Sequence, residues 1–216
     1  KLGKNFNNIN VESSYVHVGA SVLDKVLSKF CLEQSIQGFE FLTGIPGCIG
    51  GAVAMNAGCY GSEIKDIFLS AKCLDYQGNQ IIIDHSEDLF SYRNNTKTKD
   101  LIILEIKFNK LSGDKNKIFN KMEEINKNRI LSQPQKVRTA GSTFKNPTSQ
   151  SSKKAWELIE ISGSKTIERN NVTLSDKHAN FIVNKQFESA NDIEIFGELI
   201  RKKVFDKTGV LLEWEI

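Results

Sequence analysis

The chain has 216 residues, of which 39% are hydrophobic and 25% charged, and 29 Lys and Arg against 26 Asp and Glu give a formal net charge of +3. This composition is typical of a globular protein and excludes the disordered and fibrous classes. A nearly balanced charge also argues against a dedicated nucleic-acid binder, which needs a large basic excess on one face.

The cysteines and a glycine-rich stretch exclude two further classes. The four cysteines are too sparse for a disulfide-stapled secreted domain, and they contain no C-x-x-C pair of the kind that binds zinc. The uncharged residues 41–62 contain a proline and six glycines, whereas a membrane-spanning helix needs about 20 mostly large apolar residues. We therefore expect reduced thiols, a cytoplasmic location, no metal site and no membrane segment.

The first periodic segment predicts a short amphipathic helix. Its apolar residues recur at helical spacing from Val22 to Cys31, and Ser21 is placed to act as the N-cap. The helix is expected to end near Gly38, before the glycine-rich residues 44–61.

Strands follow the glycine-rich stretch. Two β-rich runs, residues 67–76 and 80–83, are joined by Gln77-Gly78-Asn79, which is a hairpin signal. Residues 101–108 predict a further strand, because they are mostly apolar and alternate near their end.

The composition changes at residues 111–115, where we place a domain boundary. Beyond it the sequence predicts a charged helix running toward Arg129, a glycine and proline cluster at 133–147, a helix around 156–159, an alternating strand at 178–184, and a helix at 191–208 that Gly209 ends.

The last residues predict a terminal strand. Val210, Leu212, Trp214 and Ile216 would share one face, so that Glu213 and Glu215 point together from the other. Considered alone, this segment is most simply read as two carboxylates that face solvent.

Two loops combine proline with glycine, which builds a rigid turn whose backbone amides can approach a ligand closely. One is the stretch from Gly44 to Gly51, and the other holds Ala140-Gly141-Ser142 between Pro134 and Pro147. The first matches neither the P-loop nor the Rossmann glycine spacing. Structural turns and a ligand-cradling loop both remain open.

Single residues with reactive side chains point to no mechanism by themselves. Ser142 lacks the G-x-S-x-G elbow of a serine hydrolase, so a catalytic triad has no support. Arg93, beside Tyr92, is either a surface group or a bidentate ligand for a carboxylate or phosphate. His178 is expected to be a hydrogen-bonded structural residue.

Four long motifs in order carry a family resemblance. They are Gly44-Ile-Pro-Gly-Cys-Ile-Gly-Gly-Ala-Val-Ala-Met-Asn-Ala-Gly-Cys-Tyr-Gly61 with Glu63, then Tyr92-Arg93, then Ala140-Gly-Ser-Thr-Phe-Lys-Asn-Pro147, then Lys177-His-Ala-Asn-Phe-Ile-Val-Asn184. Together they resemble the UDP-N-acetylenolpyruvoylglucosamine reductase (MurB) family of flavoenzymes, over essentially the whole chain. The lack of an insertion between the second and third motifs resembles the shorter, type II form.

The resemblance implies a reduction in peptidoglycan precursor synthesis, and hence in cell-wall biogenesis, cell shape and cell division. A hydride from reduced FAD, supplied by NADPH, goes to the vinyl carbon of an enolpyruvyl UDP-sugar. By motif position Arg93 would polarise the substrate carboxylate, Ser142 would donate the proton and Glu215 would stabilise the enolic intermediate, while Glu213 would be structural.

The resemblance also implies the binding residues. Tyr92, Arg129, Lys145 and Asn146 would bind the sugar nucleotide, with Arg129 at its diphosphate. Spacing alone, three residues after Ser142, suggests that Lys145 also assists Ser142. The flavin would lie against Gly44, Ile45, Pro46, Gly47, Gly50, Gly51, Asn56, Gly58 and Gly61. The partners implied are therefore FAD, NADPH and a UDP-sugar, with no nucleic acid, and the protein is expected to be a monomer.

The architecture expected is α+β. A PCMH-like FAD-binding α/β portion would span residues 1–110, and we expect it to be incomplete, with a Gly-Ser-Asn loop for the FAD diphosphate preceding Lys1. A separate α/β substrate-binding domain would span residues 113–207, and residues 208–216 would return as a strand to the active site.

Two other functions stay open from the sequence. A related FAD-dependent oxidase would consume oxygen, so oxygen uptake distinguishes it from a reductase. A non-catalytic fragment would bind a sugar nucleotide without binding flavin, which calorimetric titration with each ligand would detect.

Overall fold

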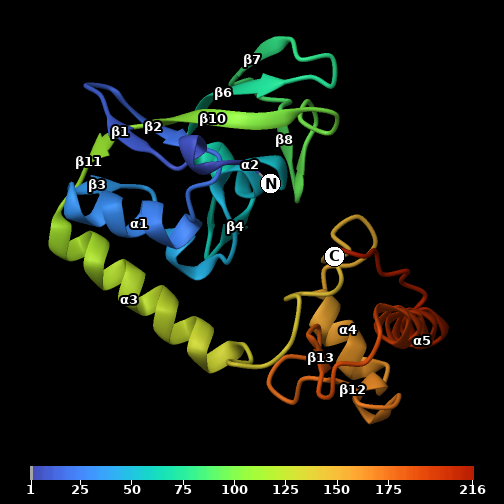
Figure 1. The fold of residues 1–216 in the computed structure, drawn as a ribbon. Helices are drawn as coiled ribbons and strands as arrows, with labels where there is room; N and C mark the ends of the chain where they lie inside the picture. The colour runs from blue at the N-terminus through green and yellow to red at the C-terminus, as the bar shows by residue number, and fades with distance from the viewer. Residues whose placement is uncertain (1) are drawn as a thin grey trace. The chain divides into compact units, whose positions relative to one another are not determined.

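The computed structural model describes residues 2–216, which form two compact units: one runs to Arg129 and the other from Ile130 to Ile216 (Figure 1). Within the described residues, no helix combines the length and apolar character needed to cross a membrane. Helix and sheet are mixed in both units, as the sequence predicted for the fold class.

The first unit is built on a five-stranded antiparallel sheet with the order β1-β2-β10-β6-β7. Its strands are β1 (Ile9–Val11), β2 (Tyr15–Gly19), β6 (Phe68–Leu74), β7 (Gln80–Asp84) and β10 (Ile102–Asn109). The predicted hairpin is confirmed: β6 pairs with β7 from Ser70 opposite Asp84 to Leu74 opposite Gln80. The turn contains Gly78 at a φ of 88°, a conformation that favours glycine.

Helices and short strand pairs complete the first unit. They are α1 (Asp24–Glu33), α2 (Ile49–Ala54), α3 (Lys115–Ser132), the pairs β3 (Ile36–Gln37) with β11 (Leu111–Ser112), β4 (Gly58–Cys59) with β5 (Ser62–Glu63) and β8 (Phe90–Ser91) with β9 (Asn94–Asn95), and the 3-10 turns η1 (Lys4–Phe6), η2 (Glu40–Gly44) and η3 (Ile64–Asp66).

Two local expectations in this unit were wrong. Helix α1 begins at Asp24, and its N-cap is Leu23 rather than Ser21, because Leu23 is extended and forms an isolated β-bridge with Cys48. The helix ends at Glu33, well before Gly38, and β3 follows. Helix α2 within the glycine-rich stretch was not anticipated, since two glycines in six residues give a weak helix signal.

The division between the units falls after Arg129, whereas the sequence placed a boundary near residues 110–113. Helix α3 packs on the first unit through its buried Ile118, Met122 and Ile125. Ser28 Oγ of α1 donates to Met122 Sδ at 3.7 Å, which places α3 alongside α1 (Figure 1). Apolar contacts therefore tie this charged helix to the residues that precede it.

The second unit packs α4 (Ala155–Ile161), η4 (Ser164–Thr166) and α5 (Ala190–Thr208) with the antiparallel pair β12 (Val172–Leu174) and β13 (Ile182–Asn184). The stop at Gly209 is confirmed, because this residue caps α5 with a φ of 73°. Two strand predictions were too long: only Ile182–Asn184 of the run 178–184 is a strand, and residues 210–216 form one isolated bridge, between Phe144 and Trp214.

Candidate functional site

The glycine-rich stretch of the first unit lies along the segment that precedes α1. Gly50 N–H donates to Ala20 O at 2.9 Å, Ile49 N–H to Val22 O at 2.9 Å, and Asp24 N–H to Gly47 O at 3.2 Å. These bonds continue the bridge between Leu23 and Cys48. Backbone hydrogen bonds therefore hold residues 47–50 of this loop.

Packing within the chain accounts for several of these glycines. A Cβ on Gly58 would lie 2.6 Å from Ser62 O. A Cβ on Gly44 would lie 3.0 Å from Ile125 Cγ2, and a Cβ on Gly50 would lie 3.0 Å from Ala20 Cβ. Backbone cannot move aside cheaply, so Gly58 is the most restricted of the three. The structural-turn interpretation holds at these positions.

Gly51 is different, and it marks the surface that fits a flat cofactor. Apart from its chain neighbours and the adjacent backbone of α2, no atom of the described residues lies within 4 Å of a Cβ built on Gly51, and the residue is exposed. Pro46 and Gly47 are also exposed, and Leu23, which bridges Cys48, is 55% exposed. Bare backbone beside apolar side chains suits an aromatic ring, so the residues present fit a flavin.

Asn56, predicted to bind the cofactor, has its side chain engaged by the protein. The residue is fully buried, and its Nδ2 donates to Glu63 Oε2 at 2.6 Å and to Ser91 O at 3.1 Å. Its Oδ1 accepts from Lys65 N–H at 3.0 Å. This amide connects the glycine-rich stretch to the β8–β9 hairpin.

Tyr92 and Arg93 form the two-residue turn of that hairpin, since Ser91 pairs directly with Asn94. Arg93 has a φ of 54°, which is uncommon for a residue with a side chain and typical of a tight turn. Its Nη2 donates to Gly58 O at 3.0 Å, and its guanidinium lies 5.0 Å from the centre of the Tyr92 ring. Arg93 is thereby anchored on the glycine-rich stretch.

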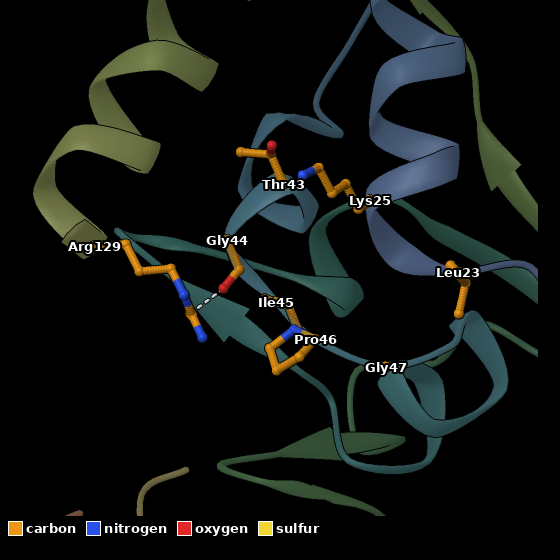
Figure 2. Close-up of a pocket in the computed structure, with 8 residues that line it drawn as sticks. All are labelled: Leu23, Lys25, Thr43, Gly44, Ile45, Pro46, Gly47 and Arg129. Carbon is orange, nitrogen blue, oxygen red and sulfur yellow. Dashed lines mark hydrogen bonds between the residues drawn. The ribbon is translucent and has the colours of Figure 1, made fainter. Parts of the chain in front are cut away.

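A pocket of about 280 Å³ opens beside the same stretch (Figure 2). Its described lining residues are Leu23, Lys25, Thr43, Gly44, Ile45, Pro46, Gly47 and Arg129, with two cations and no acidic residue among them. Arg129 Nη1, at the end of α3, donates to Gly44 O, as the dashed line in Figure 2 marks. Such a pocket suits an anion.

The two arginines also lie close enough to Cys59 to affect its titration. Burial raises the pKa of the Cys59 thiol to about 11, while the charges of Arg129 and Arg93 oppose that rise. The thiol donates to Phe41 O at 3.2 Å. Cys59 is therefore a protonated packing residue, and both predicted arginines concentrate positive charge around it.

In the second unit, Ser142 lies on an extended segment held from both sides. It forms an isolated bridge with Phe181, while Phe144, two residues on, forms a bridge with Trp214 of the tail. Glu215 N–H donates to Thr143 O at 2.9 Å, and Lys145 N–H donates to Glu213 O at 2.9 Å. The structure thus brings the predicted Ser142, Lys145 and Glu215 together on paired backbone.

The buried side chain of Asn180 fixes this segment. Its Oδ1 accepts from Phe144 N–H at 3.0 Å, its Nδ2 donates to Phe144 O at 2.8 Å, and its own carbonyl accepts from Thr143 N–H at 2.8 Å. The sequence placed Asn180 in a motif but gave it no role. The sequence signal for this role is that Asn180 is the one polar residue in the apolar run from Ala179 to Val183.

Asn146 and His178 complete the predicted set in this unit. Asn146 Oδ1 accepts from Ala155 N–H at 3.0 Å, so it supports the first turn of α4. His178 Nδ1 accepts from Asn180 N–H at 3.2 Å, and burial lowers the pKa of the imidazole. A neutral ring that accepts from the backbone and packs 4.8 Å from Phe181 fits the structural role expected for His178.

Comparisons with known proteins agree over both units. Residues 133–216 match the family described as UDP-N-acetylenolpyruvoylglucosamine reductase, C-terminal domain, and residues 1–84 match the FAD binding domain family. UDP-N-acetylenolpyruvoylglucosamine reductases of Rickettsia akari and Rickettsia typhi are each 46% identical over 216 residues, which is the whole of this chain and 72% of each relative.

A solved structure gives the same result. The crystal structure of UDP-N-acetylenolpyruvylglucosamine reductase (MurB) from Thermus caldophilus is similar with a TM-score of 0.84 and 29% sequence identity. The similarity covers 100% of this chain and 76% of that one.

Proposed function

The chain belongs to the UDP-N-acetylenolpyruvoylglucosamine reductase family, and from that premise we propose how its own residues carry the reaction. The enzyme is an FAD-dependent oxidoreductase that reduces an enolpyruvyl UDP-sugar to UDP-N-acetylmuramate in peptidoglycan precursor synthesis, with NADPH as the donor. The match to the reductase C-terminal domain excludes the oxidase alternative, because that domain contains the serine motif.

The chemistry sets two demands on the protein. Bound FAD supplies the hydride that goes to the vinyl carbon of the substrate. Negative charge then spreads onto the substrate carboxylate, and a proton must reach the carbon that bears it. The protein must therefore offer a fixed cation to the carboxylate and an acid to the carbon.

Arg93 is the cation that we assign to the substrate carboxylate. One of its nitrogens is held by Gly58 O at 3.0 Å, and the residue is half-buried on a two-residue turn. A guanidinium already oriented by a carbonyl loses less conformational freedom on binding a carboxylate, and its planar fork matches the geometry of that group. Tyr92, 40% exposed on the same turn, is assigned to the substrate.

Ser142 is the acid. It is half-buried, and the preceding Gly141 has no atom of the described residues within 4 Å of a built Cβ, so a ligand can approach this side of the loop. A hydroxyl is a weak acid and donates only to a strongly basic carbon, which is what the reaction generates. Glu215 is assigned to the enolic intermediate, beside the segment that carries Ser142.

The diphosphate of the sugar nucleotide is assigned to Arg129 and Lys25, the two cations of the pocket, while Leu23, Pro46 and Gly47 of the same lining remain with the proposed flavin surface. Arg129 was expected there from the sequence, and the structure adds Lys25 of α1 to the same lining. Two cations and a backbone turn are a fitting set for a diphosphate. Lys145 and Asn146, on the serine loop, are assigned to the rest of the substrate, and the enzyme is proposed to act as a monomer.

The observation that carries these roles is the bond from Glu215 N–H to Thr143 O at 2.9 Å, because it supports the pairing of Glu215 with the Ser142 segment. The test is Ser142→Ala in the FAD-loaded enzyme. We expect kcat to fall by a factor of about 10² or more, since general acid catalysis contributes that much. FAD content and the rate of flavin reduction by NADPH should not change.

The matched control is Ser149→Ala, which removes an exposed hydroxyl from the same loop region. It should turn over like the parent enzyme. A Ser142→Ala enzyme with the parent kcat would show that the proton comes from another group.

A further inference from the structure

The tail that carries Glu215 has little backbone support. Residues 210–216 form one isolated bridge, and two backbone bonds join this tail to the serine loop: Lys145 N–H to Glu213 O and Glu215 N–H to Thr143 O, each 2.9 Å. The start of the tail is also held by two bonds between the Leu211 backbone and the Gln150 side chain, at 3.0 and 3.1 Å, and by the buried Val210 and Leu212. The position of Glu215, closer to the end, depends in addition on its neighbour Trp214.

The indole of Trp214 rests on bare helix backbone. A Cβ on Gly197 of α5 would lie 2.0 Å from Trp214 Cη2 and 2.7 Å from Cζ2, so only glycine leaves room for the ring. The other neighbour of the indole is Phe144, with ring centroids 5.0 Å apart. The ring is thus held between α5 and the serine loop.

Hydrogen bonds also connect Trp214 and the tail backbone to α5. Trp214 Nε1 donates to Glu198 Oε1 at 2.8 Å, and Arg201 Nη1 donates to both carboxylate oxygens of Glu198 at 2.6 and 2.7 Å. Arg201 Nε donates to Leu212 O at 2.8 Å, two residues before Trp214. Side chain and backbone of the tail are therefore tied to one face of α5.

We propose that Trp214, seated on Gly197 and bonded to Glu198, is a positioning residue that sets the direction of the Glu215 side chain. Successive side chains of an extended segment point to opposite sides, so fixing Trp214 against α5 directs Glu215 away from it. The inference rests on the proposed function, because it gives Trp214 a catalytic consequence only through Glu215.

The first test compares two variants of the FAD-loaded enzyme that remove the seat in different ways. Trp214→Ala deletes the indole. Gly197→Ala instead fills the space that the indole occupies with a methyl group, and it replaces glycine by a residue of higher helix propensity. Both should lower kcat by about tenfold to a hundredfold, as displaced catalytic groups do. The KM for NADPH and the rate of flavin reduction should not change.

Ile159→Ala is the matched control for loss of stability. Ile159 is fully buried in the hydrophobic core of the second unit, but it lies on α4, away from the tail in sequence. It should lower the melting temperature and leave kcat unchanged when all enzymes are assayed well below melting. Parent-like kcat in both Trp214→Ala and Gly197→Ala would overturn the proposal.

The decisive measurement is a double-mutant cycle with Glu215→Gln. If Trp214 acts through Glu215, adding Trp214→Ala to Glu215→Gln should cause no further loss of kcat. Losses that multiply would mean that Trp214 acts independently, and the proposal would be wrong.

A second readout separates this inference from the proposed function. Hydrogen exchange at the Glu215 amide, which bonds to Thr143 O, should accelerate in Trp214→Ala. A fully active Glu215→Gln enzyme would remove Glu215 from the mechanism, yet exchange would still report whether Trp214 fixes the tail. Unchanged exchange would overturn the positioning role.

Discussion

The glycine-rich stretch of the first unit and the serine loop of the second are held in different ways. In the first, backbone bonds run directly from Gly47, Ile49 and Gly50 to residues 20–24. Glycine is needed at several positions of this stretch because two backbone segments pack closely there. In the second, the backbone bridges of the segment around Ser142 are supplemented by the buried side chain of Asn180 and the indole of Trp214.

The difference matches the roles proposed for the two regions. A flat cofactor needs a broad surface that does not move, and closely packed backbone provides one. A proton donor needs a side chain placed accurately against a small substrate, and buried hydrogen bonds from neighbouring side chains fix that position. Substitutions that target each kind of support should therefore give different results.

The largest loss of stability is expected at Gly58, where two backbone segments of the first unit pack closely. Gly58→Ala puts a methyl group 2.6 Å from Ser62 O, and we expect it to lower the free energy of unfolding by about 3 kcal/mol. Gly51→Ala is the matched control: it should change stability by less than about 1 kcal/mol. It should nevertheless raise the dissociation constant of FAD, because its methyl group covers the proposed flavin surface. Chemical denaturation measures the stability of both variants, and flavin fluorescence measures FAD binding. Equal losses of stability in Gly58→Ala and Gly51→Ala would contradict the expected difference between these two glycines.

An intermediate effect is expected from Asn180→Ala in the second unit. The change leaves Phe144 N–H and C=O without their buried partner, at a cost of about 2 kcal/mol. Asn180→Asp keeps an acceptor for Phe144 N–H but places a buried carboxylate against Phe144 O, so at pH 7 it should destabilise the protein at least as much as the alanine variant. Thermal unfolding measures the stability, while hydrogen exchange at the Phe144 amide reports the local change. Unaltered exchange in both variants would show that the loop is held without this side chain.

The smallest effect concerns Asp24 of the first unit, whose buried side chain carries an oxygen without a hydrogen-bond partner among the described residues. Its carboxyl is 1% exposed, and the oxygen concerned is Oδ1. Burial raises the pKa of Asp24 from 3.8 to about 7. Asp24 therefore ionises first in the unfolded chain, so its own contribution to stability is full below pH 4 and is lost as the pH rises through about 7.

Asp24→Asn removes that dependence. The variant should gain on the order of 1 kcal/mol over the parent at pH 8 and gain nothing at pH 4. Asp75→Asn is the control of opposite sign, because hydrogen bonds from Asn79 hold the pKa of Asp75 below its usual value. Denaturation of all three proteins at both pH values provides the comparison, and a stability difference between Asp24→Asn and the parent that does not grow from pH 4 to pH 8 would contradict the assignment to Asp24.

Features that depend on neighbours in the chain were predictable. The hairpin of β6 and β7, helix α5 with its stop at Gly209, and the burial of Val210 and Leu212 in the tail all follow from local periodicity or turn chemistry. The motifs also identified the enzyme family, since their order and length are specific. These signals need no knowledge of what lies beside the segment in space.

Other features were decided by contacts between distant residues. Helix α1 begins late because Leu23 bridges Cys48, and α3 belongs with the first unit because Met122 meets Ser28. The seat of Trp214 on Gly197 could have been suspected only from a glycine inside a strong helix, which normally weakens it. Periodicity records which side of a segment is apolar, whereas the tertiary structure alone determines which partner covers that side.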